Sequence, residues 1–227
     1  MANIPDNSKE EMRGRAGLLS SECYFLEYGN KRIKELLDYY GSSYKQLKAA
    51  AKEQFIKDMM AEGMTGARIP DDVPLSDELQ MQWNDIVESI RSEIKGIISL
   101  RYDTINKAIT DAPSTDALNS IMLLNMRKNV KEEDITALME RYGKNPQCFY
   151  AIRDIAQAHE LYWSGSNGIV EQYENLKIFD DNIQKISSNI IMDDGLKGIY
   201  KMKVDEVFTP DNAIRPYDTI DNNAEEA

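Results

Sequence analysis

The segment from Ser76 to Ala112 constrains the fold of this chain more than any other. It runs for 37 residues without a proline and with one glycine, Gly96, and its apolar residues recur at helical spacing. Counted at 100° per residue from Trp83, one side carries Leu79, Ile86, Val87, Ile90, Ile94, Ile97, Ile98, Ile105 and Ile109. The pattern predicts one long amphipathic helix over 76–112, capped by Ser76.

The length of this helix has a consequence for the shape of the molecule. A straight helix of this length extends about 55 Å, whereas a sphere equivalent to a compact domain of this size is about 45 Å across. We therefore expect either a bend near Gly96 or an elongated molecule. The apolar stripe also needs a cover, which the last long helix or a second subunit would supply.

The other segments also read as helices, over about 8–28, 31–40, 44–62, 114–129, 131–142, 147–163, 169–192 and a weaker segment that ends near residue 208. Gly29 and Gly41 are predicted helix ends. Two glycines and two prolines between residues 63 and 74 predict the main internal loop. The sequence thus predicts an all-α protein, an elongated multi-helix bundle with one long central helix, an N-terminal helical segment over 1–62 and a helical body over 75–208.

The segment 169–192 carries a seam of its own. Ile169, Leu176, Ile183 and Ile190 recur every seven residues, which is the spacing of a coiled-coil contact. These four residues are therefore predicted candidates for an interaction between helices, within the chain or with a partner.

Charge is concentrated toward the C-terminus. The net charge is −12, and residues 151–227 hold 15 acidic against 7 basic residues. Residues 209–227 hold five acids, one arginine and few large apolar side chains, so a disordered acidic tail is predicted there. Such a balance repels nucleic-acid phosphates and anionic lipid and favours basic partners.

Several features bear on the compartment. The two cysteines, Cys23 and Cys148, lie 125 positions apart, which excludes a disulfide framework and indicates reduced thiols. The first residues lack an apolar signal segment, and no apolar run approaches the ~20 residues of a membrane span. We expect a cytoplasmic protein, or a virion-associated one if a phage encodes it.

The single histidine, His159, restricts catalytic chemistry. The residue three before it is Ala156 and Trp163 stands four after it, so neither a Glu-x-x-His pair nor a His-Glu-x-x-His motif is present. On one helix Cys148 and His159 would be about 16 Å apart, too far for a catalytic dyad. We predict a histidine at the core or its edge, and no catalytic residue, metal or cofactor.

Two sets of basic residues remain as candidates. Arg101 lies in the apolar stripe of the long helix, so its charge must be paired, reach out to solvent or face an interface. A buried or half-buried ion pair with an acid from another helix is the preferred interpretation, and contact with a partner or an anion is the alternative. Lys45, Lys48 and Lys52 share one helical stripe beside Tyr44. They could follow a phosphate backbone, but a solvated face or contact with the acidic C-terminal third is the preferred interpretation.

These features favour a non-enzymatic helical protein that acts in protein–protein interaction or assembly, by self-association or with a partner, in the manner of a phage or mobile-element scaffold. The first alternative is an acidic inhibitor that mimics nucleic acid and binds a basic site on its target. An all-helical enzyme and a nucleic-acid binder acting through the three lysines are the remaining alternatives.

Overall fold

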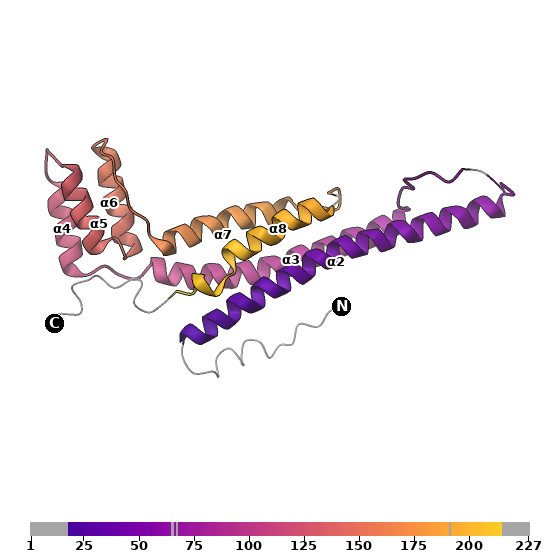
Figure 1. Cartoon of the computed structure of the whole chain (residues 1–227), viewed down its shortest axis with the longest axis horizontal. Coiled ribbons are helices and arrows are strands. Elements are labelled where there is room, and N and C mark those ends of the chain that lie inside the picture. The colour runs from indigo at the N-terminus through magenta and orange to yellow at the C-terminus, as the bar shows by residue number, and fades with distance from the viewer. Residues whose placement is uncertain (1–17, 65, 67, 191, 215–227) are drawn as a thin grey trace. The chain divides into compact units, whose positions relative to one another are not determined.

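The computed structural model describes residues 18–64, 66, 68–190 and 192–214. These residues form seven α-helices and one short 3-10 helix, with no strand among them, which confirms the all-α prediction (Figure 1). In chain order the elements are α2 (Leu18–Ala61), α3 (Asp77–Ile109), α4 (Thr115–Asn125), α5 (Glu132–Tyr142), α6 (Pro146–Ala158), α7 (Gly168–Lys185), α8 (Asp194–Val207) and the 3-10 helix η1 (Pro210–Asn212).

The described residues group into two compact units, and each unit is assembled from distant parts of the chain. The first unit comprises residues 18–27, 99–178 and 207–214, and the second comprises 28–98 and 179–206. Both units therefore need residues from early and late in the sequence.

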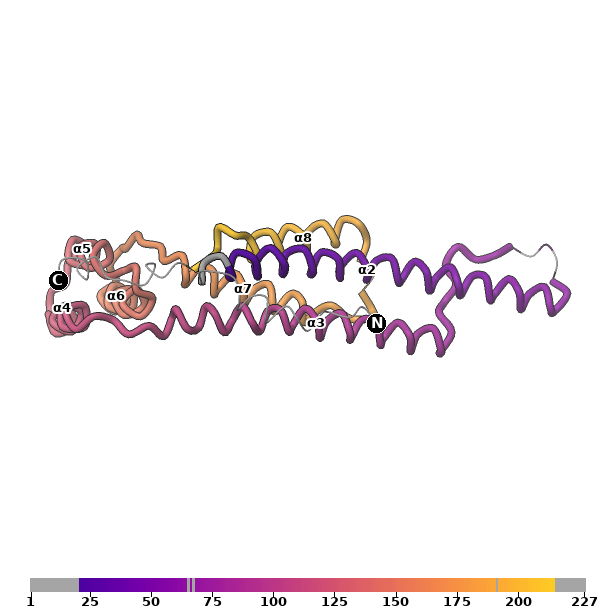
Figure 2. Tube along the Cα trace, turned by 90° about the horizontal axis from the view of Figure 1, so that it is seen from below, coloured from indigo at the N-terminus to yellow at the C-terminus, as the bar shows by residue number. Residues whose placement is uncertain are grey.

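The second unit is an antiparallel helical bundle. The ring of Trp83 on α3 contacts the ring of Tyr40 on α2, with centroids 4.7 Å apart. The Trp83 indole donates to the Ser188 carbonyl at 2.8 Å. Figure 2 shows α8 running alongside α2, and ion pairs from Lys201 to Asp38 at 2.7 Å and from Lys34 to Asp205 at 2.5 Å join the two helices. The apolar stripe of α3 is thus covered in this unit by α2 and by the segment after α7.

The helix α2 corrects the prediction that Gly29 and Gly41 end helices, because it continues through both. Both glycines are buried, and a Cβ at Gly41 would lie 3.9 Å from the carbonyl oxygen of Met192. A glycine inside a helix costs roughly 1 kcal/mol relative to alanine. Here the cost is offset by burial of apolar residues on the same helix, among them Leu26, Ile33, Leu37 and Tyr40.

The first unit contains a cluster of three short helices, α4, α5 and α6, each of which contacts the other two (Figure 1). Their shared core consists of Ala117, Ile121, Leu124, Val130, Ile135, Tyr142, Cys148, Ile152, Ile155 and Ala156. The helices α4 and α6 each begin at a side-chain cap. Ser114 accepts from the Ala117 amide, and Asn145 caps α6 with Pro146 at its first position.

Two helices end earlier than predicted. The helix expected over 169–192 stops at Lys185, and the carbonyls of Ser187 and Ile190 instead accept hydrogen bonds from the Tyr40 hydroxyl, at 2.9 and 2.7 Å. The helix expected over 147–163 stops at Ala158. His159 follows as its C-terminal cap and is half-buried, so it lies beyond the helix rather than on its apolar face.

The predicted disordered tail over 209–227 is wrong for its first residues. Pro210–Asn212 form η1, Ala213 is buried, and the Ile214 amide donates to Glu22 at 3.0 Å. Backbone hydrogen bonds to buried polar groups order this segment despite its composition. Residues 215–227 lie outside the described residues.

Candidate functional site

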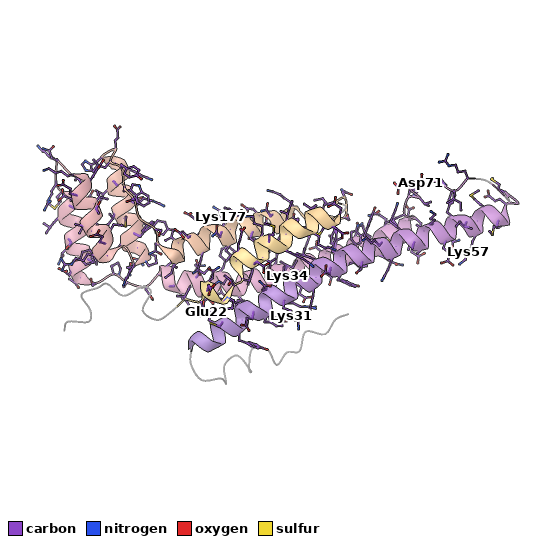
Figure 3. The ribbon with its side chains drawn as sticks, viewed as in Figure 1. Glu22, Lys31, Lys34, Lys57, Asp71 and Lys177 are labelled. Atoms are coloured by element: carbon purple, nitrogen blue, oxygen red, sulfur yellow. The ribbon has the colours of Figure 1, made fainter. Side chains whose placement is uncertain are left out.

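Arg101 lies at the centre of a buried polar network in the first unit. Its side chain is 1% exposed, and one guanidinium nitrogen donates to Glu22 at 2.5 Å. The other terminal nitrogen donates to the Gln172 side chain at 2.5 Å and to the Asn212 carbonyl at 2.6 Å. Figure 3 labels Glu22 near the start of α2. The predicted buried ion pair with another helix is confirmed.

The electrostatics of Arg101 fit a structural role. Burial lowers the pKa of its guanidinium, while the hydrogen bond and the charge of Glu22 act in the opposite direction. The Glu22 carboxylate also accepts from the Ile214 amide. The pair therefore fastens four chain segments within the unit, and the guanidinium is not available to a partner or an anion.

The predicted heptad seam is also internal. Ile169, Leu176 and Ile183 are buried, at 3% exposure or less. Ile190 is half-buried and lies beyond the end of α7. Ile169 and Leu176 belong to the first unit and Ile183 to the second, so the structure uses these residues as core and gives no support to an outward coiled-coil face.

The three lysines of α2 have different surroundings. Lys48 forms an ion pair with Asp72 and donates to the Val73 carbonyl, which fastens the loop after α2. Lys45 and Lys52 are exposed. A hydrogen bond from Lys197 lowers the pKa of Asp194, and the charge of Lys45 contributes to that shift. Only part of the stripe is a free basic face.

In the described part of the chain, no three His, Cys, Asp or Glu side chains group as metal ligands. A hollow of about 480 Å³ in the first unit is lined by Lys144, Ser166, Asn167, Gln172 and Asp211, among others. The Asn167 side chain caps α7 and donates to the Gly143 carbonyl at 2.7 Å, and Gln172 binds Arg101. Two of its polar side chains therefore already serve the fold.

None of the helices in the described ranges combines the length and the apolar character that crossing a bilayer requires.

The most prominent exposed apolar surface in the three-helix cluster lies on α4. Leu118, Met122 and Met126 follow one another at single-turn spacing and are 47%, 63% and 78% exposed, and Leu123 beside them is 63% exposed. We call these four residues the α4 face. An isolated exposed leucine is ordinary, but four adjacent large apolar side chains expose on the order of 500 Å², toward the upper end for a patch on a monomer.

The opposite side of α4 explains why the α4 face points outward. Ala117, Ile121 and Leu124 are buried in the three-helix cluster. Asp116 at the first turn accepts a hydrogen bond from the Tyr142 hydroxyl at 2.5 Å and an ion pair from Arg141. Burial raises the pKa of Tyr142, and the hydrogen bond to Asp116 acts in the same direction. These contacts fix the rotation of α4 about its axis.

Basic residues border one end of the α4 face. Arg127, Lys128 and Lys131 follow α4 directly and are all exposed; we call them the basic rim. Arg127 pairs with Asp134 at 3.2 Å. Among the described residues no carboxylate lies within ion-pair distance of Lys128 or Lys131. Glu132 and Glu133 follow Lys131 and are also exposed, so basic and acidic side chains lie next to each other at this end of the α4 face.

The sequence pattern contains a signal for the α4 face that the reasoning from seams and charges missed. An 11-residue helix can bury about one side, yet α4 and its cap hold apolar residues at 117, 118, 121, 122, 123, 124 and 126. That surplus means that some of them must remain outside the core. Because methionines more often fill gaps in a core, Met122 and Met126 do not by themselves indicate an exposed apolar surface.

A comparison with protein-family models, curated proteins and solved structures found no match to this chain.

Proposed function

We propose that this protein acts in protein–protein interaction or assembly and that the α4 face is its docking surface. The observation that carries the proposal is the outward placement of Leu118, Met122, Leu123 and Met126 on a helix whose other side is fixed in a core. Exposed contiguous apolar side chains cost solubility, and they are a typical feature of surfaces that a partner covers.

Methionine suits such a surface. Its unbranched, polarisable side chain adapts to different partner shapes, and two of the four residues of the α4 face are methionines. Because α4 is anchored through Asp116 and Ile121, docking requires no rearrangement of its backbone, so little binding energy is lost to ordering.

Site-specific photo-crosslinking tests the proposal. A photo-reactive residue placed at position 122 of the full chain should give a protein adduct in extracts of its native cells. The matched control places the same residue at Gln157, an exposed polar position on α6. Adduct formation at 122 no greater than at 157 would refute the docking surface.

The partner identified in this way allows a quantitative measurement. Burying one methionine side chain contributes about 1.5–3 kcal/mol, so Met122→Asp should raise the dissociation constant by about 10-fold or more. Thermal unfolding followed by circular dichroism serves as the control, because the exposed position predicts an unchanged fold.

A further inference from the structure

We infer that the partner that covers the α4 face is a second copy of this chain; this rests on the proposed function above. The inference begins with the charge pattern of α4. The ten residues from Ala117 to Met126 contain no charged side chain, in a chain of which 29% is charged. Depletion of charge, more than apolar character alone, distinguishes the centre of an interface from the rest of a protein surface. The α4 face thus has the composition of an interface centre.

The charges around the α4 face do not select a partner of one sign. The basic rim is followed by the exposed acids Glu132 and Glu133, and Asp116 at the other end of α4 pairs with Arg141 at 3.3 Å. The occupant must therefore match an uncharged apolar centre that is bordered by charges of both signs. The α4 face of a second copy is itself such a surface.

The net charge of the protein limits where two copies can meet. Each copy carries a net charge of −12, so two copies repel each other where their acidic surfaces approach. In a two-fold symmetric contact the residue on the axis meets its own counterpart, and a charged residue there would face a like charge. An uncharged patch such as the α4 face is therefore the surface through which this acidic protein can bind itself with the least repulsion. A basic partner would instead be drawn to the acidic surfaces.

The spacing of the α4 face suits self-pairing about Met122. Leu118 and Met126 lie four residues before and after it, so an antiparallel pair centred on Met122 places Leu118 of one copy beside Met126 of the other. A ridge with four-residue spacing packs into the groove beside the same ridge of a second helix. Asp116 and Lys128 each lie six residues from Met122. The antiparallel direction therefore brings the acidic start of one α4 toward the basic end of the other, which the helix dipoles also favour.

The size of the surface fits a symmetric dimer of standard size. Such an interface buries about 800 Å² on each partner, of which about 65% is apolar in homodimers. The α4 face exposes on the order of 500 Å² of apolar side chain, which supplies this apolar share, and the exposed Thr115, Asn119 and Asn125 lie beside it as a polar border. Because the α4 face holds no aromatic or arginine anchor, we expect a dissociation constant in the micromolar range.

Sedimentation equilibrium of the full chain tests the inference. Between about 5 and 500 µM the protein should show a reversible equilibrium between monomer and dimer. Met122→Asp and Met122→Lys should each weaken the dimer at least about 10-fold, because each places like charges at the two-fold axis. The matched control is Met202→Asp on α8, since Met202 is 64% exposed and Met122 is 63% exposed. This control should leave the equilibrium unchanged, and thermal unfolding checks that every variant keeps its fold.

A mixture of the two variants makes the test specific for a symmetric contact. Equimolar Met122→Asp and Met122→Lys place opposite charges across the axis, so they should associate with each other at least about 10-fold more tightly than either variant does with itself. A contact in which position 122 does not meet its own counterpart predicts no such recovery. A monomer at every concentration, a dimer that Met122→Asp leaves intact, or a mixture that associates no more than the separate variants would each overturn the inference.

The outcomes separate this inference from the proposed function. If the purified protein stays monomeric while position 122 crosslinks a different protein in extracts more than position 157 does, the docking surface stands and the second copy is refuted. If the protein stays monomeric and position 122 crosslinks no more than position 157, both are refuted.

Discussion

Breaking the ion pair between Arg101 and Glu22 is expected to be among the most destabilising conservative changes in the first unit. Glu22→Gln removes the counter-charge from a guanidinium that is 1% exposed and 2.5 Å from its carboxylate. Leaving one member of a buried pair without its partner costs about 3–5 kcal/mol. Because glutamine retains an acceptor, we expect a loss near 3 kcal/mol in the free energy of unfolding.

The double variant makes this prediction specific. Arg101→Met alone leaves acceptors at Gln172 and Asn212 without their donor, but Arg101→Met combined with Glu22→Gln leaves no buried charge. We therefore expect the double variant to be more stable than the sum of the single losses predicts, by about 2 kcal/mol. Urea unfolding followed by circular dichroism measures all four proteins, and hydrogen exchange of the Ile214 amide reports the local loosening.

An exposed ion pair serves as the control. Arg127 and Asp134 are separated by 3.2 Å, and the arginine is 57% exposed. A double-variant cycle at this pair should give a coupling energy below about 1 kcal/mol. Losses at Arg101 and Glu22 that add to within about 0.5 kcal/mol would refute the argument that burial makes this pair different.

Three further predictions concern titration and packing. Burial raises the pKa of Tyr40 to about 12, above the value near 10 in an unfolded chain. The neutral hydroxyl therefore contributes about 2–3 kcal/mol to the free energy of unfolding below pH 10, and this contribution is lost as the pH rises toward 12. Urea unfolding at pH 9 and pH 11.5 should show a smaller loss of stability at the higher pH in Tyr40→Phe than in the unchanged protein. Gly96→Ala should stabilise α3 by about 0.5–1 kcal/mol in thermal unfolding, because a Cβ at this exposed position meets nothing within 4 Å. Gly143→Ala should instead cost about 1–3 kcal/mol in the same assay, because a Cβ there would lie 2.4 Å from a backbone oxygen. On α4, Ile121→Ala should cost about 2–5 kcal/mol and Met122→Ala within about 0.5 kcal/mol in the same assay, and equal losses would contradict the assigned faces.

The sequence predicts the helices well where local chemistry decides. The helices α4 and α6 begin within one residue of their predicted starts, where Ser114 and Asn145 cap them, because a side-chain cap acts within three residues. The prediction that helices end at Gly29 and Gly41 is wrong, because the contacts that stabilise α2 at these positions come from residues far along the chain. A propensity of about 1 kcal/mol is too small to end a helix whose apolar side is buried.

The candidate site shows the same division between local and distant information. The burial of Arg101 in an ion pair follows from its place in an apolar stripe, but its partner does not, because Glu22 lies 79 positions away. Ile169, Leu176 and Ile183 are apolar at regular spacing, and that pattern is the same for a core and for a coiled coil. The α4 face required knowledge of which side of the helix the three-helix cluster covers.

The discontinuous units have a consequence for how the protein is made. The Tyr40 hydroxyl bonds to carbonyls about 150 positions later in the chain, and at about 5–20 residues per second a ribosome needs roughly 10–30 s to deliver them. During that interval α2 can pack against α3, which follows it in the chain, but it lacks its contacts with α8 and with the segment after α7. The core of α4, α5 and α6 is contiguous in sequence, so this cluster can assemble completely while the chain is still growing. The helix α2 stays partly uncovered for longest, so it is the segment for which a chaperone has the longest opportunity to bind.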